Sequence, residues 1–188
     1  FEMVPEACIE AVEQAEVIFS LDYNRLDRIA ALGEHVMASN AIKILIDHHI
    51  APADYFDYVL SDTSASSTSE LIYRFSKELG WLGHLNEAIA ECLYAGIMTD
   101  TGSFKFSSTS AETHRITADL MDAGLVPEKV HSAIFDTNTY DRLQLLGYAL
   151  TKKLEYDAER GVSIISLSLS EKNRFNYKKG DTEGLVNY

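Results

Sequence analysis

Three side chains that can bind metal, Asp47, His48 and His49, follow directly after the apolar run 42–46. A short run rich in isoleucine and leucine is typical of a buried strand in a parallel sheet. Ligands of open α/β sheets bind at the carboxyl ends of the strands. Imidazole combined with carboxylate suits Mn, Fe or Zn. The pattern therefore predicts a metal site, and the alternative interpretation of these residues alone is a solvated loop.

Two further elements end in an acid at a turn. The run 16–21 predicts a second strand, and Asp22 follows it. Asp100 lies where a helical pattern breaks into the glycine-flanked segment 96–104. Acids and histidines at the ends of three elements are what a two-metal phosphoesterase needs, because its carboxylates bridge cations about 3.5–4 Å apart. The alternatives are a turn or capping role for Asp22 and a plain helix end at Asp100.

Strands alternate with helical patterns over the first 150 residues, which favours an α/β fold. The fold class predicted here is a parallel β-sheet flanked by helices, followed by the start of a smaller α/β C-terminal domain. The strand expected at 162–167 would open that domain, so we expect domains 1–149 and 150–188 with a hinge near 148–160. Helices are expected at 5–15, 25–32, 68–79, 86–99, 111–123, 127–135 and 140–154, with a short helical turn at 34–39.

Charge and composition narrow the function classes. The chain of 188 residues has a net charge of −13, which argues against wrapping of long nucleic acid through many cationic contacts to phosphate. The charge is uneven: residues 1–149 carry nine Lys and Arg against 23 Asp and Glu, whereas residues 150–188 carry seven against six. An acidic metal-holding part followed by a more basic segment suits a short phosphorylated substrate, and ordinary solvated surfaces are the alternative.

Neither a membrane span nor a signal peptide is recognisable in the sequence. No apolar run approaches the length of a membrane helix, and residues 1–5 lack a basic, hydrophobic leader. Cys8 and Cys92 fall in helical patterns and are expected to be reduced thiols. We therefore expect a cytoplasmic protein that does not bind membranes, and a homodimer is one expected assembly.

Three motifs together resemble those of the DHH phosphoesterase family, closest to its nanoRNase/pAp-phosphatase branch. They are Asp47-His48-His49, the stretch from Leu21-Asp22-Tyr23-Asn24 to Arg28-Ile29, and the stretch 96–104. The motifs fall in the family's order, and the spacing from 65–70 to 99–102 also fits. The segment 179–187 resembles the start of the family's associated C-terminal domain, so the likeness covers nearly the whole chain.

The resemblance implies roles for individual residues. It gives Asp22 as a ligand bridging two metals, and His48 and Asp100 as further ligands. The cofactor implied is Mn²⁺, with two divalent metals in the full-length protein and Mg²⁺ or Co²⁺ as alternatives. Asp47 would orient the imidazole of His48. His49 would face the substrate phosphate, as a hydrogen-bond donor or as a general acid, unless it is a packed structural histidine.

Two polar groups are candidates for binding substrate. The hydroxyl-rich run that contains Ser66, Ser67 and Thr68 leads into a helix, and a helix start either attracts phosphate or is simply capped by such residues. Lys178 and Lys179 lie in the more basic C-terminal segment, where they either contact substrate phosphate or solvate a loop.

The family's first motif, of the type His-x-x-Pro-Asp-x-Asp, and its downstream glycine-rich motif do not occur in this sequence. The chain is therefore expected to be the middle of a longer protein and not to build a full two-metal site alone. The function expected from the resemblance is hydrolysis of short oligoribonucleotides or other short phosphorylated nucleotides, such as nanoRNA, pAp or linear pApA. The alternatives are an inorganic polyphosphatase or pyrophosphatase with the same metal core, and a non-catalytic nucleotide-binding module.

Overall fold

The structure is a computed structural model that describes residues 5–178, 180–182 and 185. The chain divides by its internal contacts into two compact units, Phe1–Val130 and His131–Tyr188. The division falls inside helix α6 (Pro127–Phe135), whereas the sequence placed a hinge near 148–160. The helix at 140–148 therefore belongs to the second unit, and each unit is described by itself.

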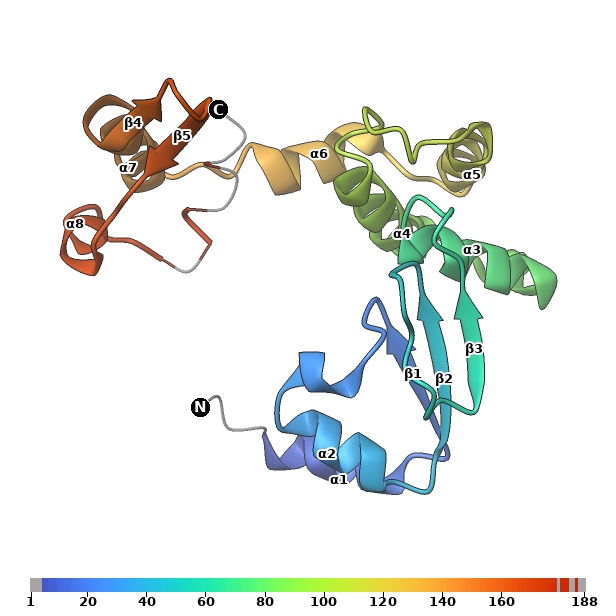
Figure 1. Cartoon of the computed structure of the whole chain (residues 1–188). Helices are drawn as coiled ribbons and strands as arrows, with labels where there is room; N and C mark the ends of the chain where they lie inside the picture. Colours follow the sequence, from blue (N-terminus) through green and yellow to red (C-terminus); the bar gives the residue numbers. More distant parts are fainter. Residues whose placement is uncertain (1–4, 179, 183–184, 186–188) are drawn as a thin grey trace. The chain divides into compact units, whose positions relative to one another are not determined.

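Within the described residues of the first unit, three parallel strands form a sheet in the order β1-β2-β3. These are β1 (Val17–Leu21), β2 (Ile42–Asp47) and β3 (Tyr58–Ser61). Leu21 pairs with Ile46, and Asp47 pairs with Ser61, so all three strands end at the same edge. Figure 1 shows their arrowheads pointing the same way, toward the side where α3 and α4 lie. The predicted parallel α/β architecture is confirmed.

Helices flank this sheet. The helices of the first unit are α1 (Glu6–Gln14), the 3-10 helix η1 (Leu26–Ile29), α2 (Leu32–Ala38), α3 (Thr68–Glu78), the 3-10 helix η2 (Trp81–His84), α4 (Glu87–Asp100) and α5 (Ala111–Asp122). Side chains of Ser67, Asn86 and Ser110 cap the starts of α3, α4 and α5 by accepting a hydrogen bond from a backbone N–H of the first turn. These three starts are the ones that the sequence predicted.

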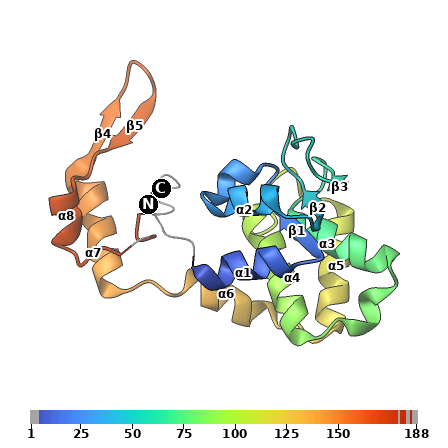
Figure 2. The same ribbon diagram turned by 90° about the horizontal axis from the view of Figure 1, so that it is seen from below.

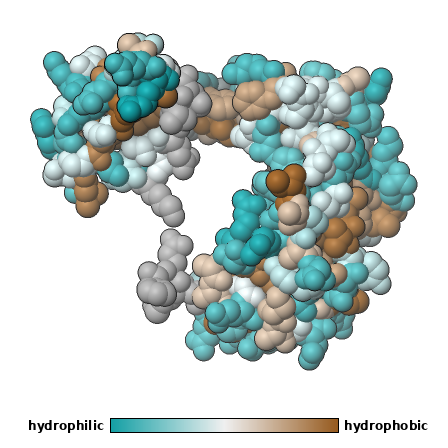
Figure 3. All heavy atoms as spheres, viewed as in Figure 1, coloured by the Kyte–Doolittle hydropathy of each residue, from teal (hydrophilic) through white to brown (hydrophobic). Residues whose placement is uncertain are grey.

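The core lies between the sheet and α3, and it continues into α4 and α5. Ile46 of β2 packs with Ala65 and Leu71, and the partly buried Ile44 and Phe75 pack against this cluster. Alternate residues of a strand face opposite sides, so Ile44 and Ile46 turn to α3. The space-filling view shows separate hydrophobic patches among hydrophilic surface on the face it presents (Figure 3).

The second unit contains a small antiparallel hairpin. Strands β4 (Leu154–Asp157) and β5 (Val162–Ile165) pair with each other, as Figure 2 shows. They follow α7 (Tyr140–Tyr148) and a π-helical stretch, Ala149–Lys153, and they precede α8 (Leu169–Asn173). The expected helix 140–154 was wrong at its end, because its last residue opens β4.

One further expectation was wrong in the first unit. The sequence predicted a helix over 25–32 that Gly33 would close, but η1 ends at Ile29 and Gly33 lies inside α2. Gly33 serves close packing instead: a Cβ there would lie 2.3 Å from the carbonyl oxygen of Leu26. Its missing side chain lets α2 approach η1, so the glycine marks a packing contact and not a helix end. The segment 50–63, expected to be irregular or a short strand, contains β3.

Candidate metal centre

Asp22 is placed at the sheet edge by the end of β1. Its backbone N–H donates to the carbonyl of Ile46 at 3.2 Å, which extends the β1–β2 ladder by one residue. Its φ is +66°, a left-handed conformation that aspartate tolerates better than most residues. The chain turns sharply here, and the Asp22 side chain remains 56% exposed. The carboxylate is thus fixed by the backbone and is accessible.

His48 lies between two carboxylates. Its Nε2 is 3.7 Å from Oδ1 of Asp22 and 3.6 Å from Oδ2 of Asp100. On the other side of the ring, Nδ1 lies 3.3 Å from the carbonyl oxygen of Ala65. A carbonyl only accepts, so Nδ1 is the nitrogen that donates in this contact. Nε2 is then the ring nitrogen that faces both acids, which is the orientation of a metal-binding histidine.

Asp47 supports His49, whereas the sequence analysis paired it with His48. Asp47 is fully buried, and its Oδ1 accepts hydrogen bonds from the backbone N–H of His49 at 2.7 Å and from its Nδ1 at 2.6 Å. The difference arises because β2 ends at Asp47, so the strand pattern does not fix which of the two following histidines this acid contacts. The second oxygen of Asp47, Oδ2, is buried and has no hydrogen-bond partner within the described part of the chain.

Asp100 is the last residue of α4, which carries it to the same place from a third element. Burial raises the pKa of its carboxyl, and the negative charge of Asp22 raises that pKa further. Two acids that oppose each other's ionisation are stabilised by a shared cation. One ligand atom each from Asp22, His48 and His49 also lies within 4.8 Å of the others. The donor set of carboxylate and imidazole therefore fits a divalent transition metal.

The hydroxyl-rich run divides into two kinds of residue. Thr68 donates to Oδ1 of Asp22 at 2.7 Å, so it reaches the metal cluster through that carboxylate. Ser67 accepts from the backbone N–H of Glu70 at 3.1 Å, as the cap of α3. Ser66 donates to Oε2 of Glu70 at 2.5 Å. Both serines are buried, and their hydroxyls are engaged inside the protein.

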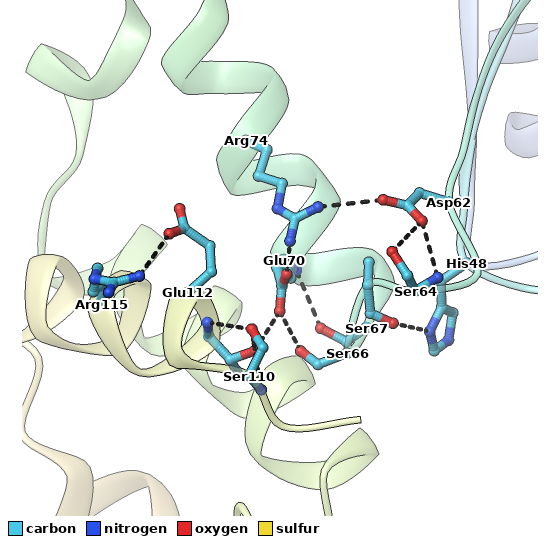
Figure 4. A network of polar contacts seen from close by, with 12 residues as sticks. His48, Asp62, Ser64, Ser66, Ser67, Glu70, Arg74, Ser110, Glu112 and Arg115 are labelled. Carbon is cyan, nitrogen blue, oxygen red and sulfur yellow. Dashed lines mark hydrogen bonds and ion pairs between the residues drawn. The ribbon is translucent and has the colours of Figure 1, made fainter. Parts of the chain in front are cut away.

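The buried acid Glu70 connects the hydroxyl-rich run to the surrounding helices through polar contacts (Figure 4). Its Oε2 also accepts from the hydroxyl of Thr113 on α5 at 2.8 Å, and its Oε1 contacts Nη2 of Arg74. Arg74 in turn contacts Asp62, which follows β3. Because Ala65 lies in the segment held by these contacts, the network also fixes the carbonyl that orients His48.

Sequence reasoning missed Glu70, and it missed the role of Asn24. Asn24 is nearly buried, and its side-chain amide donates to the carbonyl of Ile50 at 2.6 Å. The backbone carbonyl of Asn24 accepts a hydrogen bond from the backbone N–H of Ala53 at 3.0 Å. These contacts hold the chain that leaves His49. The spacing of Ser67 and Glu70, typical of a capping box, signalled a helix start but not the buried contacts that Glu70 makes.

Of the two lysines proposed to contact substrate, Lys178 is exposed in the second unit, where its backbone N–H donates to Asp181 at 2.7 Å. Lys179 lies outside the described residues. Among the described residues, no helix is both long and apolar enough to cross a membrane.

Several known proteins are similar to this chain. Residues 2–97, about half of the chain, match the family described as the DHH family, N-terminal domain. The bifunctional oligoribonuclease and PAP phosphatase NrnA of Bacillus subtilis is 38% identical over 102 residues, which are 53% of this chain and 32% of that protein. Its probable counterpart in Streptococcus mutans is 32% identical over 147 residues, 76% of this chain and 44% of that protein.

A solved crystal structure has a fold similar to that of this chain. The crystal structure of an exopolyphosphatase-related protein from Bacteroides fragilis matches with a TM-score of 0.92 and 36% identity, over 97% of this chain and 53% of that one. The chain thus spans between about a third and a half of the length of these proteins. From the family match over residues 2–97, together with the meeting of Asp22, His48 and Asp100 from β1, β2 and α4, it follows that this chain belongs to the DHH family.

Proposed function

We propose that the full-length protein is a divalent-metal-dependent phosphoesterase that hydrolyses short phosphorylated nucleotides, such as nanoRNA, pAp or linear pApA. The observation that carries the proposal is the placement of His48 Nε2 within 3.7 Å of two carboxylates from two other elements. The names of the Bacillus subtilis and Streptococcus mutans relatives support the substrate class.

Asp22, His48 and Asp100 would hold the metal, which we propose to be Mn²⁺. Bound divalent metals supply a hydroxide at neutral pH and offset the charge on the attacking and leaving oxygens of a phosphoester. Asp47 is buried, its Oδ1 accepts from His49, and its Oδ2 has no hydrogen-bond partner among the residues that the structure describes. Neighbouring positive charge compensates the cost of such a buried carboxylate.

The chain's own residues orient the site. The hydroxyl of Thr68 fixes one oxygen of Asp22, and the carbonyl of Ala65 fixes the ring of His48. Asp47 holds the ring of His49 in place through Nδ1. We propose that His49 hydrogen-bonds the substrate phosphate and gives a proton to the leaving oxygen as the P–O bond breaks. Asp47 would then act as the residue that positions this acid, in the way that carboxylates orient catalytic histidines elsewhere.

A second candidate is hydrolysis of inorganic polyphosphate or pyrophosphate at the same cluster. The specific observation in its favour is the name of the Bacteroides fragilis structure, which is exopolyphosphatase-related. The two candidates share the metal ligands and differ in whether the substrate carries a base. A non-catalytic nucleotide-binding module would keep the fold without turnover.

A substrate panel with the full-length protein distinguishes these candidates. It would contain pAp, pApA, RNA of two to five nucleotides, cyclic dinucleotides, pyrophosphate and polyphosphate, each with Mn²⁺ and with a chelator. We expect chelator-sensitive release of mononucleotide or phosphate from the short nucleotides. Turnover of the inorganic substrates alone would favour the second candidate, and turnover of none would favour the binding module.

A further inference from the structure

The loop that joins α4 to α5 has an unusual backbone directly beside the metal cluster. Three consecutive residues after Asp100 adopt positive φ: Gly102 at +56°, Ser103 at +59° and Phe104 at +64°. Only glycine adopts this conformation without cost, so two of the three positions are strained. Backbone strain of this kind persists only where the surrounding contacts enforce the conformation, and it is frequent at functional sites.

Thr101, the residue that follows Asp100, holds this backbone. It is fully buried, and its hydroxyl accepts from the N–H of Phe104 at 3.0 Å. Its carbonyl accepts from the N–H groups of Lys105 and Phe106, both at 3.0 Å. Phe106 is therefore hydrogen-bonded to Thr101, the immediate neighbour of the proposed metal ligand Asp100, although it lies five residues after Thr101 in the chain.

The two aromatic side chains of the loop have different environments. Phe104 is half-buried, with its ring stacked on His114 at a centroid distance of 5.5 Å and close to Tyr94. The Phe106 side chain is 56% exposed. Its ring rests against Gly102, because a Cβ at that glycine would lie 2.5 Å from Cζ of Phe106. The absent Cβ of Gly102 thus makes room for a ring that still presents much of its surface to solvent.

We propose that Phe106 is a stacking platform for a nucleobase of the substrate whose phosphate binds at the metal cluster. This inference rests on the proposed function and names the part of the substrate that the loop contacts. An exposed aromatic ring stacks on any base, because every base has a π-face, and a phenylalanine has no polar group with which to select one. The site would therefore accept short nucleotides of any sequence, and inorganic phosphate chains would gain nothing from the ring.

Binding of two ligands that differ only in the base tests the platform. AMP and ribose 5-phosphate would be titrated by calorimetry into the full-length protein loaded with Mn²⁺, as wild type and as Phe106→Ala, Phe106→Leu and Phe106→Tyr. We expect Phe106→Ala and Phe106→Leu to weaken AMP binding about tenfold, within the range measured for loss of one aromatic stack. Ribose 5-phosphate binding should stay the same in all four proteins, and Phe106→Tyr should bind AMP as wild type does.

Leucine keeps apolar bulk against Gly102 and loses the π-face, so it separates stacking from simple packing. Tyr58→Ala is the matched control: Tyr58 is also an exposed aromatic of the first unit, but it begins β3 and lies at the opposite edge of the sheet. It should leave both affinities unchanged. Unchanged AMP affinity in Phe106→Ala, an equal loss for ribose 5-phosphate, or wild-type binding of both ligands with equal affinity would overturn the proposal.

The same proteins separate this inference from the proposed function. If wild type hydrolyses short RNA and Phe106→Ala has the same KM, the proposed phosphoesterase activity is supported and the stacking role of Phe106 is rejected. If the protein hydrolyses no nucleotide but binds AMP more tightly than ribose 5-phosphate, and Phe106→Ala weakens AMP binding, the stacking role is supported and the proposed phosphoesterase activity is rejected.

Discussion

At the scale of single residues, the centre depends on side chains that are oriented before any ligand arrives. The backbone turn at Asp22 and the hydroxyl of Thr68 fix one carboxylate, and the carbonyl of Ala65 fixes the ring of His48. Asp47 fixes His49. Groups held in this way lose little conformational entropy on binding a ligand, so more of the interaction free energy appears as affinity.

The two histidines should differ in what their loss removes. His48 Nε2 faces Asp22 and Asp100, whereas His49 is hydrogen-bonded to Asp47 and its Nδ1 lies 4.0 Å from Asp22. His48→Ala is expected to lower metal content after dialysis, and His49→Ala is expected to lower kcat with most metal retained. Metal analysis alongside kinetics measures both quantities. Metal loss in His49→Ala with full occupancy in His48→Ala would reverse the assignment.

Thr68 should affect the metal through Asp22 alone. Thr68→Val keeps the shape of the side chain and removes the hydroxyl that donates to Asp22 at 2.7 Å. We expect Mn²⁺ affinity to fall about tenfold, the lower end of the effect of losing such a supporting group. Thr117→Val is the control, because the Thr117 hydroxyl donates to the carbonyl of Thr113 within α5. Equal affinities in the two variants would show that Thr68 does not position Asp22.

The sequence indicated Asp22, His48 and Asp100 as candidate site residues because each ends or follows an element with a readable hydrophobic pattern, and the structure brings these three side chains together. It did not identify the partner of Asp47, because that depends on which face each side chain takes after the last strand residue. Nor did it identify Glu70 and Thr113 as neighbours, since they are 43 residues apart and on different helices. Contacts of this kind follow from packing, which local patterns do not encode.

At the scale of elements, the ends of helices and strands were predicted where a local chemical signal marks them. The cap residues before α3, α4 and α5 are such signals, and so are Asp22 directly after β1 and Asp47 at the last position of β2. Gly33 was wrongly predicted to end a helix, because glycine occurs both at helix ends and where two segments pack closely. The close approach of the Leu26 backbone shows that Gly33 is of the second kind. β4 was missed because the helical pattern before it runs on through a π-helical stretch without a break.

Glu70 should matter most for stability, since it joins α3 to α5. It is buried and accepts from Ser66 and Thr113. Glu70→Gln keeps the size but replaces an acceptor oxygen with an amide group that faces those donors. We expect a loss of about 1–3 kcal/mol in the free energy of unfolding, the usual cost of an unsatisfied buried polar group.

Thermal or urea unfolding measures this effect, and Glu112→Gln provides a matched control. Glu112 pairs with Arg115 at the surface at 3.5 Å, and the loss of such a pair is expected to change stability by less than about 1 kcal/mol. If Glu70→Gln unfolded at the same denaturant concentration as Glu112→Gln, the network would not be holding the helices together.

At the scale of the whole molecule, the charge is divided between an acidic part with the metal cluster and a C-terminal segment of nearly balanced charge. Residues 150–188 carry seven Lys and Arg against six Asp and Glu, in a chain whose net charge is −13. A polyanionic substrate approaching the acidic part gains from cations beyond the site, since these offset long-range repulsion. The exposed Lys178 belongs to that segment.

Replacing Lys178 and Lys179 by Ala in the full-length protein should raise KM for short RNA and leave kcat nearly unchanged. Cations that contact phosphate along a substrate stabilise the ground and transition states alike, so their loss affects binding and not the chemical step. The salt dependence of KM should also become weaker, because fewer ionic contacts remain to be screened. Kinetics at two salt concentrations test this, and unchanged KM with unchanged salt dependence would assign both lysines to a solvated loop.

The central claim is that Asp22 belongs to a metal centre assembled from β1, β2 and α4. Asp22→Asn tests it most directly, because asparagine also tolerates the positive φ of this position and keeps the side-chain shape while removing the charge. Mn²⁺ binding would be measured by calorimetry on the full-length wild type and variant, with circular dichroism to compare their folds. If the proposed function holds, we expect an unchanged fold, at least tenfold weaker Mn²⁺ binding and loss of nucleotide hydrolysis. Wild-type Mn²⁺ affinity and turnover in Asp22→Asn would contradict the account.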